Sequence, residues 1–153
     1  MTTLSELLPA HHVDLALSAT TKTAAVDDIL ARLEGHACVK NFPGLKAAIE
    51  ARDASVIFED GLGLLIAHGR TEAVSRIVLA AGRFNPPLQL PGEAGPVHLV
   101  FVAGIPAAFS TEYLRVVGAI VRCCKDPESL PALLSAPSAA AFVQLLTEGE
   151  SRL

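Results

Sequence analysis

The clearest hydrophobic pattern in the chain belongs to two segments that predict β-strands. In residues 13–17 apolar and polar positions alternate, which is typical of a strand with one buried face. Residues 97–103 are almost continuously apolar and end at Gly104-Ile105-Pro106. A run of this kind favours a strand that is buried on both faces, so it must be covered from two sides.

Two further apolar runs lie between these segments. Leu64-Leu65-Ile66-Ala67 is compact and ends at His68-Gly69-Arg70. Residues 75–82 are a strand candidate that Asn85-Pro86-Pro87 would end, although the alanines of this segment also permit a helix. We therefore expect short strands in the middle of the chain.

Helical periodicity predicts two helices in the first third of the chain. Apolar residues recur at i, i+3, i+4 and i+7 from about Lys22 to Leu33, after Thr21 as a capping residue. A second helix is predicted from Pro43, just after Asn41, to about Asp53. The apolar face of this second helix is continued by Arg52, a charge where an apolar side chain is expected.

The last third of the chain predicts three helices. Ser110 can cap a helix over residues 111–125 with a broad apolar face, Asp126-Pro127 begins a short helix through Leu133 and Leu134, and Ser138 can cap the last one. Helices and near-continuous apolar strands are thus mixed along the chain. The expected fold class is α/β, a single-domain sandwich over residues 1–153 with helices on both faces of the sheet.

Composition and charge exclude several classes of protein. Of the 153 residues 51% are hydrophobic and 18% are charged, which excludes intrinsic disorder, and the net charge of −4 offers no footprint for nucleic acid. No stretch reaches the roughly 18 apolar residues of a membrane span, and the amino terminus lacks signal-peptide features. The three cysteines are Cys38, Cys123 and Cys124, and their odd number suits neither a disulfide framework nor a zinc site. We expect a cytoplasmic domain without metal or cofactor. Its high content of apolar residues is also compatible with a homo-oligomer interface.

Five histidines are the first candidates for chemistry. His11, His12 and His36 are expected to be exposed loop residues. His68 closes an apolar run and is followed by a glycine turn, where α/β proteins present reactive side chains, but an idle loop histidine fits equally well. His98 lies inside the most apolar strand, where a core histidine satisfied by one backbone hydrogen bond is the favoured interpretation.

Arg52, His68 and His98 would form a phosphoryl-transfer site if the fold brought them together. A neutral imidazole can attack a phosphoryl group, and the guanidinium fork matches phosphate oxygens. Burial would lower the pKa of a histidine and keep its lone pair free. Their spacing does not establish convergence. A histidine metal site and a hydrolase are both disfavoured, because no histidine pair has i, i+4 spacing and no G-x-S-x-G turn is present.

Three ordered stretches carry a family resemblance. They are the glycine-rich residues 61–69, the strand-like residues 95–101, and residues 113–126, and Arg52 precedes the first of them. In order and spacing they resemble the enzyme IIA family of the bacterial phosphoenolpyruvate-dependent sugar phosphotransferase system, in its fructose, mannitol and nitrogen-regulatory branch. The resemblance covers nearly the whole chain.

This resemblance implies a phosphoryl carrier, the phosphotransferase component that takes phosphate from HPr onto a histidine. The phosphate then passes to an enzyme IIB or serves as a regulatory signal. The resemblance also implies a mixed sheet flanked by helices, with His68 as the phosphorylated nucleophile and Arg52 as the phosphate clamp. His98 inherits no role from the family.

The chain departs from the family pattern at three places. Ala67 replaces the usual proline before the active histidine, and Tyr113 stands where the family has a second histidine. Ile57-Phe58-Glu59 replaces a Ser-Thr-Gly stretch of the phosphate site, and Asp60 adds a second carboxylate that would repel phosphate if it lay close. Two hypotheses therefore remain: an active phosphocarrier, and a diverged non-catalytic regulatory binding module of the same fold.

Overall fold

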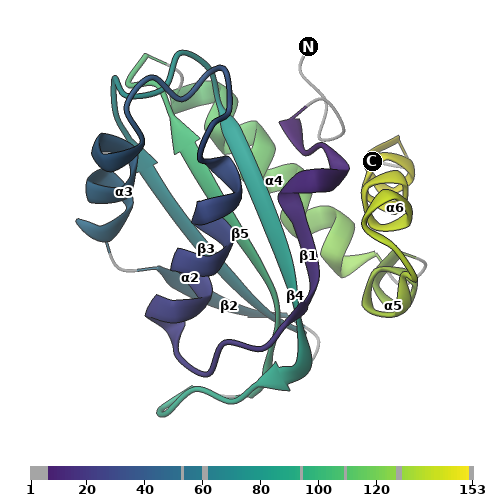
Figure 1. Ribbon diagram of the computed structural model, residues 1–153. Helices are drawn as coiled ribbons and strands as arrows, with labels where there is room; N and C mark the ends of the chain where they lie inside the picture. The colour runs from purple at the N-terminus through teal and green to yellow at the C-terminus, as the bar shows by residue number, and fades with distance from the viewer. Residues whose placement is uncertain are drawn as a thin grey trace.

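The chain folds around one five-stranded mixed sheet with the strand order β1-β4-β5-β3-β2, as the computed structural model in Figure 1 shows. The strands are β1 (Val13–Leu17), β2 (Ser55–Glu59), β3 (Leu62–Arg70), β4 (Val78–Leu88) and β5 (Val97–Ile105). The structure describes residues 7–52, 54–59, 62–93, 95–108, 110–126 and 129–151.

The sheet is mixed because two of its four pairings are parallel. β1 pairs with β4 and β3 with β5 in parallel, whereas β2 pairs with β3 and β4 with β5 antiparallel. The central strand β5 therefore has a parallel neighbour on one side and an antiparallel one on the other. This confirms the expected α/β fold with a mixed sheet.

Helices cover both faces of this sheet (Figure 1). One face carries α2 (Lys22–Leu30), the short 3-10 helix η2 (Ala31–Leu33) and α3 (Phe42–Glu50). The other face carries α4 (Ser110–Lys125), α5 (Ser129–Ser135) and α6 (Ala139–Ser151), and the 3-10 turn η1 (Ala10–His12) precedes β1. Two apolar clusters, one on each face, form the core.

Strand alternation assigns the side chains of β3 to these two clusters. Leu64 and Ile66 pack in the cluster under α4, whereas Leu65 and Ala67 pack in the cluster under α2 and α3. Because successive side chains of a strand point to opposite faces, His68 follows Ile66 on the α4 side.

Side-chain hydrogen bonds cap three of the described helices, and those of Thr21 and Ser138 confirm predicted caps. Thr21 Oγ1 accepts from the backbone N–H of Ala24 at 3.1 Å, and Asn41 Oδ1 accepts from that of Gly44 at 3.1 Å. Ser138 Oγ accepts from the N–H of Ala141 at 3.1 Å. Each side chain satisfies a donor that the first helical turn leaves unpaired.

The second predicted helix is shorter than expected, and this matters for Arg52. α3 ends at Glu50 with Ala51 as its C-cap, so Arg52 lies in the turn after the helix and not on its apolar stripe. The side chain of Arg52 is exposed. The predicted end at Asp53 lies outside the described residues, as do Asp60, Pro127 and the side chain of Ser110.

Two strand predictions also differ from the structure. No element was predicted over residues 55–59, where the structure has β2. β4 begins at Val78 and runs through Asn85-Pro86-Pro87 to Leu88, where the segment was expected to end. Its pairing with β5 shifts register between Arg83 and Leu88, and such an irregularity accommodates prolines that cannot donate to a ladder.

His12 contradicts the expectation of an exposed loop residue, and His36 departs from it in part, whereas His11 is exposed as expected. His12 is 1% exposed, and its Nδ1 lies 3.1 Å from the carbonyl oxygen of Leu79. His36 is half-buried and its ring lies 5.3 Å from that of His12, whereas His11 is exposed. The reason is that η1 turns the His12 ring inward against β4, which a polar lead-in sequence does not reveal.

Candidate functional site

Arg52 and His68 meet at one end of the sheet. Nη1 of Arg52 lies 3.3 Å from Nε2 of His68. A guanidinium carries donors and no acceptor, so a hydrogen bond between these atoms requires a lone pair on Nε2. The neutral ring then carries its proton on Nδ1, and Nε2 is the nitrogen that is free to act as a nucleophile.

Gly69 allows the two residues to approach each other. A Cβ at this position would lie 2.8 Å from the carbonyl carbon of Ala48 and 2.8 Å from the backbone nitrogen of Ile49. The last turn of α3 therefore packs against β3 at a distance that only glycine permits. Leu45 and Ile49, both buried, hold α3 on the sheet, and the turn that follows carries Arg52 to His68.

Tyr113, in the first turns of α4, closes the other side of His68. The two ring centroids lie 4.7 Å apart with an interplanar angle of 31°. This tilted contact between the two rings restricts the rotation of the imidazole. α4 is held in place by buried residues such as Val116 and Ile120, so the ring of Tyr113 is presented by a packed helix.

The environment keeps His68 neutral. Burial is the largest cause that lowers its pKa below 6.5, and the charges of Arg52 and Arg70 lower that pKa further. Burial raises the pKa of Tyr113 above 10, against a smaller opposing effect of Arg52. At neutral pH the site therefore holds an unprotonated imidazole, a neutral phenol and a guanidinium.

This combination suits phosphoryl transfer. The lone pair on Nε2 can attack phosphorus, and the adjacent guanidinium can donate hydrogen bonds to the negative oxygens of the incoming group. In the part of the chain that the structure describes, no group of three or more histidine, cysteine or acidic side chains is arranged to hold a metal ion.

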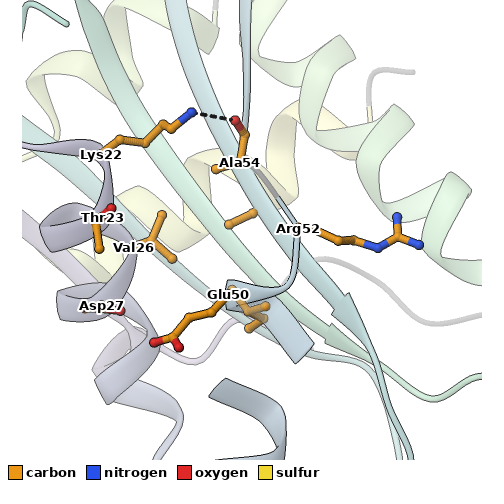
Figure 2. A pocket seen from close by; sticks show the side chains of 9 residues that line it. Lys22, Thr23, Val26, Asp27, Glu50, Arg52 and Ala54 are labelled. Atoms are coloured by element: carbon orange, nitrogen blue, oxygen red, sulfur yellow. Dashed lines mark hydrogen bonds between the residues drawn. The ribbon is translucent and has the colours of Figure 1, made fainter. Parts of the chain in front are cut away.

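A pocket of about 180 Å³ lies on the other side of the Arg52 backbone, between α2 and the end of α3. Figure 2 shows Lys22, Asp27 and Glu50 around it, with the guanidinium of Arg52 turned away from them. Ala67 also lines this pocket. Ala67, which stands where the family usually has proline, thus lies on the α2 side of the sheet, opposite to His68.

The structure does not bring His98 to this site. His68 pairs with Ala103 in the β3–β5 ladder, and His98 lies five residues earlier on β5, about 16 Å away at the usual strand rise. Nδ1 of His98 accepts the backbone N–H of Gly63 at 3.3 Å, and burial lowers its pKa below 6.5. This geometry matches a structural histidine satisfied by one backbone bond.

The segment Ile57-Phe58-Glu59 is also remote from His68, contrary to the expected repulsion of phosphate. Its residues pair with Leu64, Gly63 and Leu62. The backbone of Glu59 therefore lies six residues, or about 20 Å, from the level of His68. The antiparallel β2–β3 ladder carries this segment away from the site, which spacing along the sequence could not indicate.

Sequence reasoning missed one charged residue near the nucleophile. Arg70 is exposed, lies two residues after His68 on β3 and acts on its pKa. The period of two in a strand is the signal that could have found it, since residues i and i+2 share a face.

No helix among the described residues has both the length and the apolar content needed to cross a membrane. The described cysteines, including buried Cys123 and Cys124, are free thiols, and burial raises the pKa of Cys124 to about 12. A thiol in that state is a poor nucleophile, so Cys124 belongs, with buried Cys123 beside it, to the core and not to a site.

Comparison with known proteins identifies the family. The model of the phosphoenolpyruvate-dependent sugar phosphotransferase system EIIA 2 family matches residues 6–149. The fructose-specific EIIA component of Haloferax volcanii is 24% identical over 149 residues, which are 97% of each chain.

Solved structures share the fold. The nitrogen regulatory protein IIA-Ntr from Neisseria meningitidis has a TM-score of 0.76 at 22% identity, covering 94% of this chain and 99% of its own. The Escherichia coli enzyme IIAMtl, solved in complex with phosphorylated enzyme IIBMtl, has a TM-score of 0.68 at 15% identity, covering 93% and 99%. Since the family model spans nearly the whole chain, this protein belongs to the EIIA 2 family of the phosphoenolpyruvate-dependent sugar phosphotransferase system.

Proposed function

We propose that this EIIA protein carries its phosphoryl group on Nε2 of His68, with Arg52 as the phosphate clamp. The observation that carries the proposal is the 3.3 Å separation between Nη1 of Arg52 and Nε2 of His68, which marks the nitrogen with the free lone pair. The donor would be an HPr-like phosphocarrier in the cytoplasm. The acceptor would be an enzyme IIB-like protein, or the phosphorylated form would itself be the regulatory signal.

The transfer needs few groups from the protein. The lone pair on Nε2 attacks phosphorus, a phosphorus–nitrogen bond forms, and the bond to the donor atom breaks with its electron pair returning to the donor. His68 keeps the proton on Nδ1, so its ring carries the positive charge of the product. Arg52 faces the phosphoryl oxygens, and no step requires a metal or a cofactor.

Tyr113 acts as a positioning residue in this proposal. Its ring holds the imidazole by stacking, and its phenol remains a neutral hydrogen-bond donor because burial raises its pKa. Phosphoryl transfer depends strongly on alignment, so a fixed ring favours attack on an incoming donor.

Two relatives support the choice of partners. The complex of IIAMtl with phosphorylated IIBMtl supports an enzyme IIB as the acceptor, and the likeness to IIA-Ntr supports regulatory use of the same phosphorylated state.

The test is phosphorylation by the complete donor chain. The protein is incubated with phosphoenolpyruvate, enzyme I and HPr, and intact-mass and peptide-mapping spectrometry locate an acid-labile phosphate. We expect one phosphate on His68 in the wild type, none in His68→Ala, and full labelling in His11→Ala, which removes an exposed histidine. Wild-type protein that stays unlabelled would favour the diverged regulatory binding module instead.

A further inference from the structure

Arg70 is a further arginine on the side of the sheet where His68 lies, and it is on the same strand as His68. The two residues are separated by one position on β3, where Gly69 pairs with Gly104 and Arg70 with Ile105. Because side chains at i and i+2 of a strand share a face, His68 and Arg70 project to the same side, with Cα atoms about 6.6 Å apart. Arg70 is exposed, and an arginine side chain at this spacing can extend to a group bound to the imidazole.

The charge of a phosphoryl group exceeds the charge that a single arginine can neutralise. A phosphoryl group carries about −1.5 to −2 charges near neutral pH, whereas Arg52 supplies a single positive charge. Among the residues that the structure describes, Arg52 and Arg70 are charged groups that act on the pKa of His68, and both lower it. The field of Arg70 therefore reaches the imidazole even before any phosphate is present.

The two arginines approach the nucleophile from different elements. Arg52 comes from the turn after α3 and contacts Nε2 directly. Arg70 comes from the last position of β3, on the same strand as His68. A group bonded to Nε2 would thus have one guanidinium beside its point of attachment and a second one farther along the strand.

We propose that Arg70 is a second phosphate-binding residue, which holds the phosphoryl group on His68 as a dianion together with Arg52. This inference rests on the proposed function, because it concerns the same phosphorylated nitrogen. It adds a residue to the site and predicts a property of the phosphorylated form, namely a low pKa of the phosphoryl group itself.

The test uses a chemical donor, so that it does not depend on a protein partner. Phosphoramidate transfers its phosphoryl group to an imidazole: the nitrogen–phosphorus bond of the donor breaks, the Nε2–phosphorus bond forms, and ammonia leaves. Phosphorus-31 NMR then follows the titration of the phosphoryl group in the wild type, in Arg70→Gln and in Arg70→Lys. Arg122→Gln is the matched control, since it removes one exposed arginine nine residues beyond Tyr113 on α4.

Loss of a nearby cation destabilises the dianion, so we expect Arg70→Gln to raise the pKa of the phosphoryl group by about half a unit to one unit. Arg70→Lys should restore most of this shift, and Arg122→Gln should leave the titration unchanged. The inference is overturned if Arg70→Gln and Arg122→Gln titrate alike, or if phosphoramidate does not label His68. Labelling by phosphoramidate but not by phosphorylated HPr would overturn the proposed function alone, and the titration would still decide the role of Arg70.

Discussion

Nε2 of His68 faces the guanidinium of Arg52, a hydrogen-bond donor that does not lose its proton. Since the guanidinium of Arg52 stays charged at every physiological pH, protonation of Nε2 would place two positive groups 3.3 Å apart. The contact with Arg52 thus explains why Nε2 of His68 is unprotonated and contributes to the lowered pKa of His68. It also places a positive charge where a negative ligand would bind. Each of these properties can be tested by changing one side chain.

The Arg52→Gln substitution tests the charge of Arg52, because glutamine keeps a polar side chain without that charge. In Arg52→Gln the pKa of His68 should rise toward 6.5, because a positive charge that lowers it is lost. Transfer from HPr should slow by about 10- to 100-fold, the cost of one charge-assisted hydrogen bond to phosphate. NMR titration of the His68 ring and the rate of phosphorylation measure the two effects. An unchanged rate would show that Arg52 is no phosphate clamp.

Tyr113 is expected to act through its ring. Tyr113→Phe keeps the stacked ring and should retain most of the phosphorylation rate, whereas Tyr113→Ala exposes His68 to water and frees its rotation. The pKa of His68 should then rise, because burial is the main cause of its low value. Ring titration by NMR and the transfer rate are the measurements. If Tyr113→Phe is as slow as Tyr113→Ala, the hydroxyl and not the ring carries the role.

The packing of α3 on β3 determines where Arg52 lies. Gly69→Ala would insert a methyl group 2.8 Å from the backbone of α3, and backbone cannot yield as a flexible side chain does. We expect a loss of about 1–3 kcal/mol in the free energy of unfolding, together with slower phosphorylation as α3 shifts. Urea unfolding and the transfer rate check this.

Gly118→Ala is the matched control for this substitution. The added methyl group would meet only the tip of the Arg122 side chain, at 3.0 Å. Alanine in a helix interior is favoured over glycine, so this variant should be as stable as the wild type or about 0.5–1 kcal/mol more stable. If both alanine variants unfold alike, the close packing at Gly69 does not fix the site.

Local rules predicted the elements that depend on local interactions. Thr21 and Ser138 predicted their helices because each cap hydrogen bond spans three residues. The strand predicted over residues 97–103 follows from its own composition and lies within β5. β2 could not be predicted, because its pairing with β3 and not its own pattern makes it a strand.

The site was predicted in part, for similar reasons. A charge after an apolar helix and a histidine after an apolar run were visible along the chain. The separation of His98 from His68 depends on the ladder register, and the burial of His12 depends on contact with β4. Neither interaction is local in sequence, so neither was predicted.

The molecule as a whole carries several histidines that folding keeps neutral. Burial lowers the pKa of His12, His68 and His98 below the ordinary histidine value of 6.5. Below pH 6.5 these three histidines bind protons in the unfolded chain that they do not bind in the folded chain. The stability from these groups is therefore complete above pH 6.5 and is lost as the pH falls through their folded-state values.

His12 should contribute visibly to this acid sensitivity, because its ring is 1% exposed and lies near those of His11 and His36. We expect the melting temperature to fall between pH 7.5 and pH 5, by less in His12→Gln than in the wild type. His11→Gln, in the same 3-10 turn, is the control. Calorimetry at several pH values checks this, and equal falls in the wild type and His12→Gln would contradict it.

The central claim, that His68 is phosphorylated on Nε2 beside Arg52, is tested most directly by NMR of the ring nitrogens. Protein labelled with nitrogen-15 is phosphorylated through HPr, and long-range proton–nitrogen spectra identify the nitrogen coupled to phosphorus. We predict that coupling at Nε2 of His68. Phosphate at Nδ1 of His68, on another histidine, or on no histidine at all would contradict it.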